Sequence, residues 1–140
     1  NPHARGMISG LTRGKTRAHI ARATLEAMAL QNAEILLAMQ KDLNRPLRSV
    51  RVDGGAAANN LLMQIQSDYL GVEVVRPQMI ETTSLGAAYL AGLGVGFWKS
   101  KDELAKIYKV NKKFSPKLSL EKRNQRLLGW QMAIRRATLT

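Results

Sequence analysis

The sequence predicts an α/β fold arranged around one parallel strand–helix–strand unit. Residues 50–52 alternate apolar and charged side chains, as a half-buried strand does, and residues 72–75 form a second short, valine-rich strand. Between them lie a glycine turn and a helical pattern that ends at Gly71, a position typical of a C′ glycine. Two strands joined by such a helix pair in parallel through a right-handed connection.

Composition limits the class of protein. A chain of 140 residues, 45% of them hydrophobic, predicts a single domain with enough apolar side chains for a core. The lack of cysteine excludes disulfides and thiolate metal sites and favours a reducing, cytoplasmic location. Two histidines are too few for a zinc cluster, and no apolar run reaches the roughly 18 residues of a membrane span. Residues 1–3 show no feature of a signal peptide.

The N-terminal part is expected to contain one long helix. Residues 6–11 predict a short strand or extended arm, and residues 12–15 predict a basic turn. The Thr16 hydroxyl can cap a helix that continues to about Lys41, before Pro46 forbids helical backbone. Apolar residues at spacings of three, four or seven predict its buried face: Ala21, Leu25, Met28, Ile35 and Met39.

A third helix is expected after the second strand. Residues 81–84 offer caps for a helix that continues to about Ala91. The glycines at positions 92, 94 and 96 predict a loosened connection after it. Phe97 and Trp98 follow, and we expect these aromatic side chains to anchor the connection in the core.

The C-terminal part is expected to consist of a short helix, a linker and a final helix. Residues 100–103 form a capping box that predicts a helix to about Tyr108. Residues 109–117 predict a basic linker, after which Ser119 caps the last helix. The buried stripe of that helix is predicted to be Leu127, Trp130, Ile134 and Ala137.

The stretch most suggestive of function is the turn between the two strands. Gly54 and Gly55 permit positive φ and a close approach of the backbone to a ligand. The helix that follows directs unpaired N–H groups back at the turn, which suits phosphate or another polar ligand. Asp53 could be a metal ligand or a catalytic base. We favour the interpretation that it braces the turn by bonding backbone N–H groups.

Three other motifs have simpler interpretations. Residues 10–16 resemble a P-loop, but three residues rather than four separate the glycines, so we favour a basic turn that precedes a helix. Residues 92–96 lack the spacing of a dinucleotide-binding turn and follow a helix rather than a strand. His19 has no carboxylate obviously placed beside it, so we predict a structural role rather than acid–base catalysis.

The net charge of +12 admits two interpretations. A basic chain can bind an acidic partner such as nucleic acid. Alternatively, its basic surface is solvated, or is balanced by acidic regions of a longer protein. The basic residues of the last helix are not interleaved with exposed aromatic residues, and Arg135 and Arg136 complement the helix dipole. We therefore favour the solvated surface and expect binding to neither nucleic acid nor membrane.

Three motifs together resemble the C-terminal part of the FGGY family of carbohydrate kinases. Residues 6–26, with Gly10 and His19 at their expected positions, match the C-terminal signature of the family. Residues 47–60 match its nucleotide turn. Residues 81–98 resemble the members that act on glycerol rather than on sugars. The similarity covers almost the whole chain and weakens after about residue 109.

The resemblance implies part of a ribonuclease-H-like, actin-like ATPase domain whose earlier strands are outside this sequence. Residues 1–109 would be the core nucleotide-binding portion, and residues 110–140 a linker and C-terminal helix. The implied reaction is transfer of the γ-phosphoryl group of ATP to glycerol, giving glycerol 3-phosphate, with Mg²⁺ as the metal.

The resemblance also assigns roles to residues of the turn. Gly55 and Asn59 would contact the nucleotide, ATP or ADP, and Gly54 and Ala56 would shape the turn. Glycerol and the catalytic base would be held by an N-terminal domain that this sequence lacks. We therefore expect no catalytic residue and no metal ligand in this chain.

Two consequences and three alternatives follow. Phosphoryl transfer needs groups from both sides of a cleft, so we expect these 140 residues alone to be inactive. Two strands with unpaired edges favour self-association, so a homo-oligomer is expected. The alternatives are another FGGY sugar kinase, such as one for a pentulose, a basic nucleic-acid-binding module, and a split gene product that only binds a partner subunit.

Overall fold

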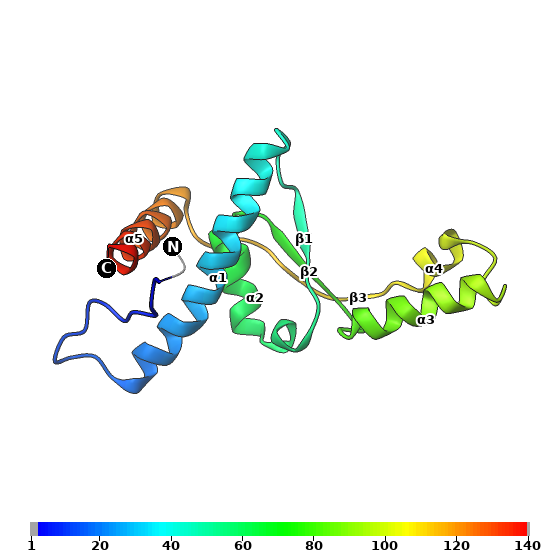
Figure 1. Cartoon of the computed structure of the whole chain (residues 1–140), viewed down its shortest axis with the longest axis horizontal. Helices are drawn as coiled ribbons and strands as arrows, with labels where there is room; N and C mark the ends of the chain where they lie inside the picture. Colours follow the sequence, from blue (N-terminus) through cyan, green and yellow to red (C-terminus); the bar gives the residue numbers. More distant parts are fainter. Residues whose placement is uncertain (1–2, 140) are drawn as a thin grey trace.

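The computed structural model describes residues 3–139, which form a packed body and a projecting arm (Figure 1). In chain order the elements are α1 (Arg17–Asp42), β1 (Ser49–Arg51), the 3₁₀ helix η1 (Gly55–Ala58), α2 (Asn60–Leu70), β2 (Glu73–Pro77), α3 (Thr82–Gly94), α4 (Lys101–Ile107), β3 (Val110–Phe114) and α5 (Leu120–Thr138). Helices α1 and α2 lie beside the sheet and α5 packs against these two helices, whereas α3 and α4, here called the arm, extend away from the sheet.

The sheet has the order β1–β2–β3 and contains both strand orientations. β1 and β2 are parallel, with Val50 opposite Val74, and α2 lies between them in the chain. The predicted strand–helix–strand unit is therefore confirmed. β2 and β3 are antiparallel, with Val74 opposite Phe114.

The prediction of a linker over residues 109–117 is wrong at residues 110–114, which form β3. This strand carries Lys112 and Lys113, and both lysines are exposed. Charged side chains are common on edge strands because they discourage further strand pairing. A run of basic residues in the sequence therefore does not distinguish a linker from an edge strand.

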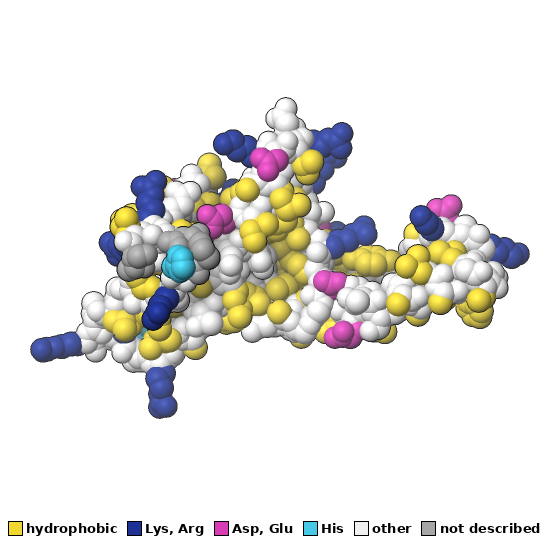
Figure 2. Space-filling model, in the orientation of Figure 1, with side chains coloured by type: hydrophobic (Ala, Val, Ile, Leu, Met, Phe, Trp, Pro, Cys, Tyr) yellow, Lys and Arg dark blue, Asp and Glu magenta, His cyan; other side chains and the backbone are white. Residues whose placement is uncertain are grey.

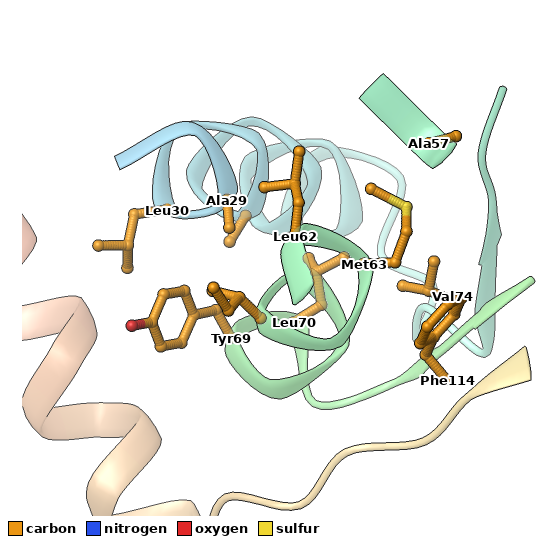
Figure 3. Packing of buried hydrophobic residues seen from close by; sticks show 11 residues of the cluster. Ala29, Leu30, Ala57, Leu62, Met63, Tyr69, Leu70, Val74 and Phe114 are labelled. Carbon is orange, nitrogen blue, oxygen red and sulfur yellow. The ribbon is translucent and has the colours of Figure 1, made fainter. Parts of the chain in front are cut away.

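Helix α2 supplies the largest share of the core and packs against both α1 and the sheet (Figure 3). Each large apolar side chain buried there stabilises the fold by about 1.5–3 kcal/mol. The buried cluster consists of Ala29, Leu30, Ala33, Ala57, Leu62, Met63, Ile65, Tyr69, Leu70, Val74 and Phe114.

Two buried polar side chains of α2 connect it to its neighbours. Gln66 donates from Nε2 to the carbonyl oxygen of Ala29 at 3.2 Å and accepts from Asn32 Nδ2 at 3.2 Å. Ser67 Oγ lies 2.8 Å from the carbonyl oxygen of Phe114. Because these groups are satisfied, their burial carries no penalty from unpaired donors or acceptors.

Helix α1 has nearly the predicted ends, but it packs with a different face from the one predicted. Only Leu25 of the predicted set packs against the buried cluster, while Met28, Ile35 and Met39 are about half exposed, at 49%, 54% and 50%. The buried face consists of Ala29, Leu30 and Ala33. Their alanine side chains let α1 approach α2 closely. The helix has apolar residues on two sides, and spacing alone does not decide which side meets α2.

The segment before α1 is exposed, and residues 6–11 form no strand. The predicted basic turn is confirmed by a hydrogen bond from the Lys15 N–H to the Thr12 carbonyl oxygen at 3.0 Å. Thr16 is the N-cap of α1, as predicted, and its N–H donates to His19 Nδ1 at 3.2 Å. This contact gives His19 the structural role expected for it.

The arm differs from its predicted structure in two respects. Helix α3 continues through Gly94, so the loosened connection begins later than expected. Phe97 is 75% exposed and does not reach the core. Trp98 instead packs edge-on against Tyr89, with ring centroids 5.2 Å apart, so the aromatic pair stabilises the arm itself.

The predicted capping box at the start of α4 forms only in part. Ser100 is the N-cap, but its side chain makes no capping hydrogen bond. Glu103 Oε2 accepts the N–H of Lys99 at 2.9 Å, one residue before the position expected for a capping box.

Helix α5 closes one side of the body. Ser119 caps it as predicted, its Oγ accepting an N–H of the first turn at 3.3 Å. Arg123 Nε donates to the carbonyl oxygen of Tyr69 at 2.8 Å, and Trp130 Nε1 donates to Glu34 Oε2 at 3.0 Å. The stripe predicted to be buried is only half-buried: Leu127, Trp130, Ile134 and Ala137.

Candidate functional site

The glycine turn, residues 53–59, leads from the end of β1 to the start of α2. Gly54 has φ 77° and ψ 173°, a conformation that L side chains rarely adopt, so the predicted need for glycine is confirmed there. The backbone then forms η1, whose Ala57 is buried with 1% exposure and anchors the turn in the core. We expected the turn to lead directly from the strand into the helix. Instead, the short 3₁₀ helix η1 lies between β1 and α2.

Asn59 ends the turn and is the N-cap of α2. Its Oδ1 accepts the N–H groups of Leu61 at 3.0 Å and of Leu62 at 3.1 Å. This satisfies two of the N–H groups that the first turn of a helix leaves unpaired. Within residues 3–139 no hydrogen bond uses the Nδ2 group, and the residue is exposed. The amide therefore presents its two remaining donors to the outside.

Gly55 is exposed at the start of η1, at the opposite end of this helix from Asn59. A Cβ built on Gly55 would meet no atom within 4 Å, so packing inside the described chain does not require a glycine there. The open backbone leaves room for a ligand that approaches closely. Gly54 and Ala56, the other two predicted site residues, take part in the hydrogen bonds that shape the turn.

Two contacts attach the turn to Ile80 and Thr82, around the start of α3. The Gly54 N–H donates to the carbonyl oxygen of Ile80 at 2.7 Å. The hydroxyl of Thr82, the first residue of α3, donates to the Asp53 carboxylate. Asp53 therefore braces the turn as we favoured, but through a side chain rather than through backbone N–H groups.

A third contact comes from Arg76 on β2, which the sequence did not single out. Its Nη1 donates to the carbonyl oxygens of Ala57 at 2.7 Å and Ala58 at 3.1 Å, and its Nη2 donates to Asn60 Oδ1 at 2.9 Å. The available signal was a charged residue between the apolar residues Val75 and Pro77 of a strand. That signal indicates a partner but does not identify it.

Two clefts lie near the turn, and neither was predicted. The smaller, of about 330 Å³, is lined by α1, β1 and α2 together with Asp53, Ala56 and Ala57 of the turn. The larger, of about 700 Å³, lies between the end of β2, α3 and α4, and Thr82 is part of its lining. Most of the side chains that line both clefts are apolar.

Properties of the described residues bear on metal binding, titration and membrane insertion. Among residues 3–139, no three or more His, Cys, Asp or Glu side chains gather in a way that could hold a metal ion. Burial raises the pKa of the Tyr69 phenol to about 12, and the Glu26 carboxylate adds to the rise, so the phenol stays protonated near neutral pH. None of the helices within the same residues combines the length and hydropathy of a membrane span.

Basic side chains do not form one patch on the face seen in Figure 2. Lysine and arginine side chains lie at separate places over the body and the arm, with hydrophobic side chains exposed between them. This distribution supports the interpretation of the +12 charge as a solvated surface. That the chain does not bind nucleic acid stays a prediction.

Residues 1–95 match the C-terminal domain of the FGGY family of carbohydrate kinases. The chain belongs to this family. Among curated relatives, a glycerol kinase of Bdellovibrio bacteriovorus is 62% identical over 135 residues, and one of Saccharolobus islandicus is 55% identical over 137 residues. These alignments cover 96% and 98% of this chain but only 27% of each relative.

Solved structures of FGGY kinases share the fold. A glycerol kinase of Plasmodium falciparum, solved with ADP, matches with a TM-score of 0.87 at 35% identity, over 99% of this chain and 28% of that chain. A xylulose kinase of Rhodospirillum rubrum matches with a TM-score of 0.78 over 96% of this chain and 28% of that one, at 24% identity, which supports the fold alone. The predicted fold class, a helix-rich part of an actin-like ATPase domain with a parallel strand pair, is confirmed.

Proposed function

We propose that this FGGY chain forms part of the nucleotide site of a kinase that transfers the γ-phosphoryl group of ATP to glycerol. The product would be glycerol 3-phosphate. The observation that carries the proposal is the glycine turn, which has an open backbone at Gly55, where η1 begins, and an exposed amide at Asn59, where η1 ends. The choice of glycerol is supported by the glycerol kinases among the relatives.

The donor set of the turn fits a nucleotide. The Gly55 backbone permits close approach, and the Nδ2 group of Asn59 donates to an oxygen or ring nitrogen of the nucleotide. Gly54 and Ala56 hold the shape of the turn. Within this chain these groups bind and orient ATP, and none of them moves a proton.

Mg²⁺ is part of the proposal as the partner of ATP. In kinase sites this ion is bound mainly by substrate phosphates, water and one or two carboxylates. Residues 3–139 contain no cluster of three or more side chains suited to a metal ion. Because this chain spans 27% of the length of its curated relatives, we place the metal carboxylates, the catalytic base and the glycerol site in another part of the kinase. We place the reaction in the cytoplasm, where ATP is available.

The proposal predicts that the 140-residue chain alone forms no measurable glycerol 3-phosphate. Positioning of the acceptor hydroxyl and stabilisation of the transferring phosphoryl group need both sides of the cleft. An enzyme-coupled assay for glycerol 3-phosphate measures this directly. ATP-dependent product formation by the isolated chain would contradict the division of roles proposed here.

The nucleotide role of the turn is tested in the intact kinase with two substitutions of Asn59. Asn59→Ala removes both the cap and the Nδ2 donor, so it should lower stability by about 1 kcal/mol and raise the KM for ATP. Asn59→Asp keeps a capping oxygen but replaces the donor with a negative charge. We expect Asn59→Asp to preserve the melting temperature and still raise the KM for ATP, with the KM for glycerol unchanged.

These two variants separate capping from ligand binding. If Asn59→Asp binds ATP normally, the residue is only a cap and the proposed nucleotide contact is wrong. If the KM for glycerol rises instead, the turn faces the other substrate. The choice of acceptor is tested by comparing kcat/KM for glycerol with that for a panel of pentuloses, and a preference for a pentulose would overturn glycerol.

A further inference from the structure

We propose that Arg76 is a positioning residue that keeps the glycine turn in its nucleotide-binding shape. This inference rests on the proposed nucleotide role of the turn. Arg76 does not reach Gly55 or Asn59 by any hydrogen bond of the described chain. It acts through the peptide groups between them.

The contacts of Arg76 surround the last part of η1. The carbonyl oxygens of Ala57 and Ala58 accept from Nη1, and the side-chain oxygen of Asn60 accepts from Nη2. Nε donates to Asn111 Oδ1 of β3 at 3.0 Å. One guanidinium therefore joins the turn, the first residue of α2 and the edge strand.

The turn needs such a contact because η1 is only four residues long. A 3₁₀ helix of this length leaves carbonyl oxygens at its C-terminal end without partners inside the helix. Arg76 supplies charge-assisted donors to two of them. Since Gly55 begins η1 and Asn59 follows it, fixing these carbonyls also fixes the spacing of the two predicted nucleotide contacts.

The sheet alone does not account for an arginine at this position. Its partner across the antiparallel pair is Lys112, and like charges directly opposite destabilise a sheet. Both cations lie over the Phe114 ring, 5.4 Å and 5.1 Å from its centroid. No salt bridge among residues 3–139 involves Arg76. The charge is therefore matched to the oxygens of the turn and of the two asparagines.

Arg76→Lys in the intact kinase tests the inference. An ammonium keeps the charge, but it cannot present the planar fork of donors that reaches four oxygen atoms at once. We expect the KM for ATP to rise about tenfold, the scale of losing a charge-assisted hydrogen bond, while the KM for glycerol and the melting temperature change little. Arg51→Lys is the matched control, because Arg51 lies on the neighbouring strand and its guanidinium lies over the Tyr108 ring, with no hydrogen bond to the turn among residues 3–139.

Asn60→Ala is the second variant, in case Arg76→Lys lowers stability. It removes one acceptor of the guanidinium and places a strong helix former at the start of α2. The KM for ATP should rise by a smaller factor. In the double variant the two effects should be less than multiplicative, because both act through one contact. Full multiplicativity, or a KM for ATP unchanged in Arg76→Lys, would overturn the positioning role.

The outcome also distinguishes this inference from the proposed function. If Asn59→Asp raises the KM for ATP and Arg76→Lys does not, the turn binds nucleotide and the role of Arg76 is wrong. If neither variant changes the KM for ATP and both raise the KM for glycerol, the proposed nucleotide role of the turn is wrong. An equal rise of both KM values in Arg76→Lys, with a lowered melting temperature, would show a purely structural arginine.

Discussion

At the scale of single residues, the structure requires glycine at position 71 but not at position 86. Gly71 has φ 71°, and a Cβ there would lie 2.6 Å from Nη1 of Arg123. Gly86 lies inside α3, where a Cβ would meet nothing within 4 Å. We expect Gly71→Ala to destabilise the chain by roughly 1–2 kcal/mol from backbone strain, in addition to displacing Arg123. Gly86→Ala should be neutral or stabilise by up to about 1 kcal/mol.

Thermal unfolding of both variants checks this pair. The control is internal, since each substitution adds the same methyl group to the same chain. Gly71 ends α2 in the left-handed conformation, which strains an alanine. Equal melting temperatures for Gly71→Ala and the unmodified chain would contradict this strain.

Tyr69 makes stability depend on pH at the alkaline end. Burial, assisted by the Glu26 carboxylate, raises the pKa of its phenol from 10.0 in the unfolded chain to about 12 in the folded one. Between these values the unfolded state loses the proton first, so stability should fall as pH rises from 10.0 to about 12. Below that window the contribution is constant.

Urea denaturation at several pH values, compared between the chain and Tyr69→Phe, measures this dependence. Lysine titration affects both proteins alike, so their difference isolates the phenol. The free energy of unfolding should fall less steeply with pH in Tyr69→Phe. Parallel curves for the two proteins would contradict a raised pKa.

Residue-scale predictions from sequence succeeded where the cause is local. Gly71, Thr16 and Ser119 lie at helix ends as expected, because backbone conformation and capping depend on a few neighbouring residues. Arg76 could not be assigned in this way. Its acceptors at residues 57–60 come close only after β2 pairs within the sheet and α2 folds back on it.

At the scale of elements, α3 and α4 of the arm contribute no residue to the buried cluster or to the apolar side chains packed against it. None of the residues of α3 or α4 is buried, and Trp98 packs against Tyr89 within the arm. A Cβ on Gly92 would collide with the Trp98 ring, whereas one on Gly94 would meet nothing within 4 Å. We expect Gly92→Ala to displace Trp98 and loosen the arm, while Gly94→Ala leaves it intact.

Hydrogen exchange followed by mass spectrometry tests this difference. Exchange in residues 82–107 should be faster than in α2 even in the unmodified chain, because local opening is easiest where few apolar contacts are buried. Gly92→Ala should accelerate it further without affecting α2. Equal exchange in the two glycine variants would show that Trp98 does not restrain the arm.

Element boundaries were predictable here to a greater extent than element faces. The ends of α1 were marked by Thr16 and by the turn before Pro46, and both signals are local. The packing face was not marked, because Met28 and Ile35 satisfy the helical spacing as well as the buried Ala29 and Leu30 do. β3 was missed for a related reason: its only buried residue is Phe114, so it shows no alternation.

At the scale of the whole molecule, the exposed apolar face of α1 continues into the uncovered edge of the sheet. Ile35 and Leu36 of α1 line the same cleft as Val50 and Val52. β1 is at one end of the strand order, so its outer edge has no partner in the described chain. Since the chain spans 27% of the length of its curated relatives, we propose that the rest of a kinase covers this surface.

An isolated 140-residue chain would therefore present a continuous apolar surface and an open strand edge to water, and we expect it to self-associate through them. Ile35→Lys places a charge in the middle of that surface, where the side chain is 54% exposed, so it should reduce the associated fraction without unfolding the chain. Leu90→Lys, at a 69% exposed site on the arm, is the control for added charge alone. Light scattering across a concentration series gives the mass of each variant. A monomeric unmodified chain at high concentration, or equal dissociation by both lysines, would show that α1 and β1 do not form the contact.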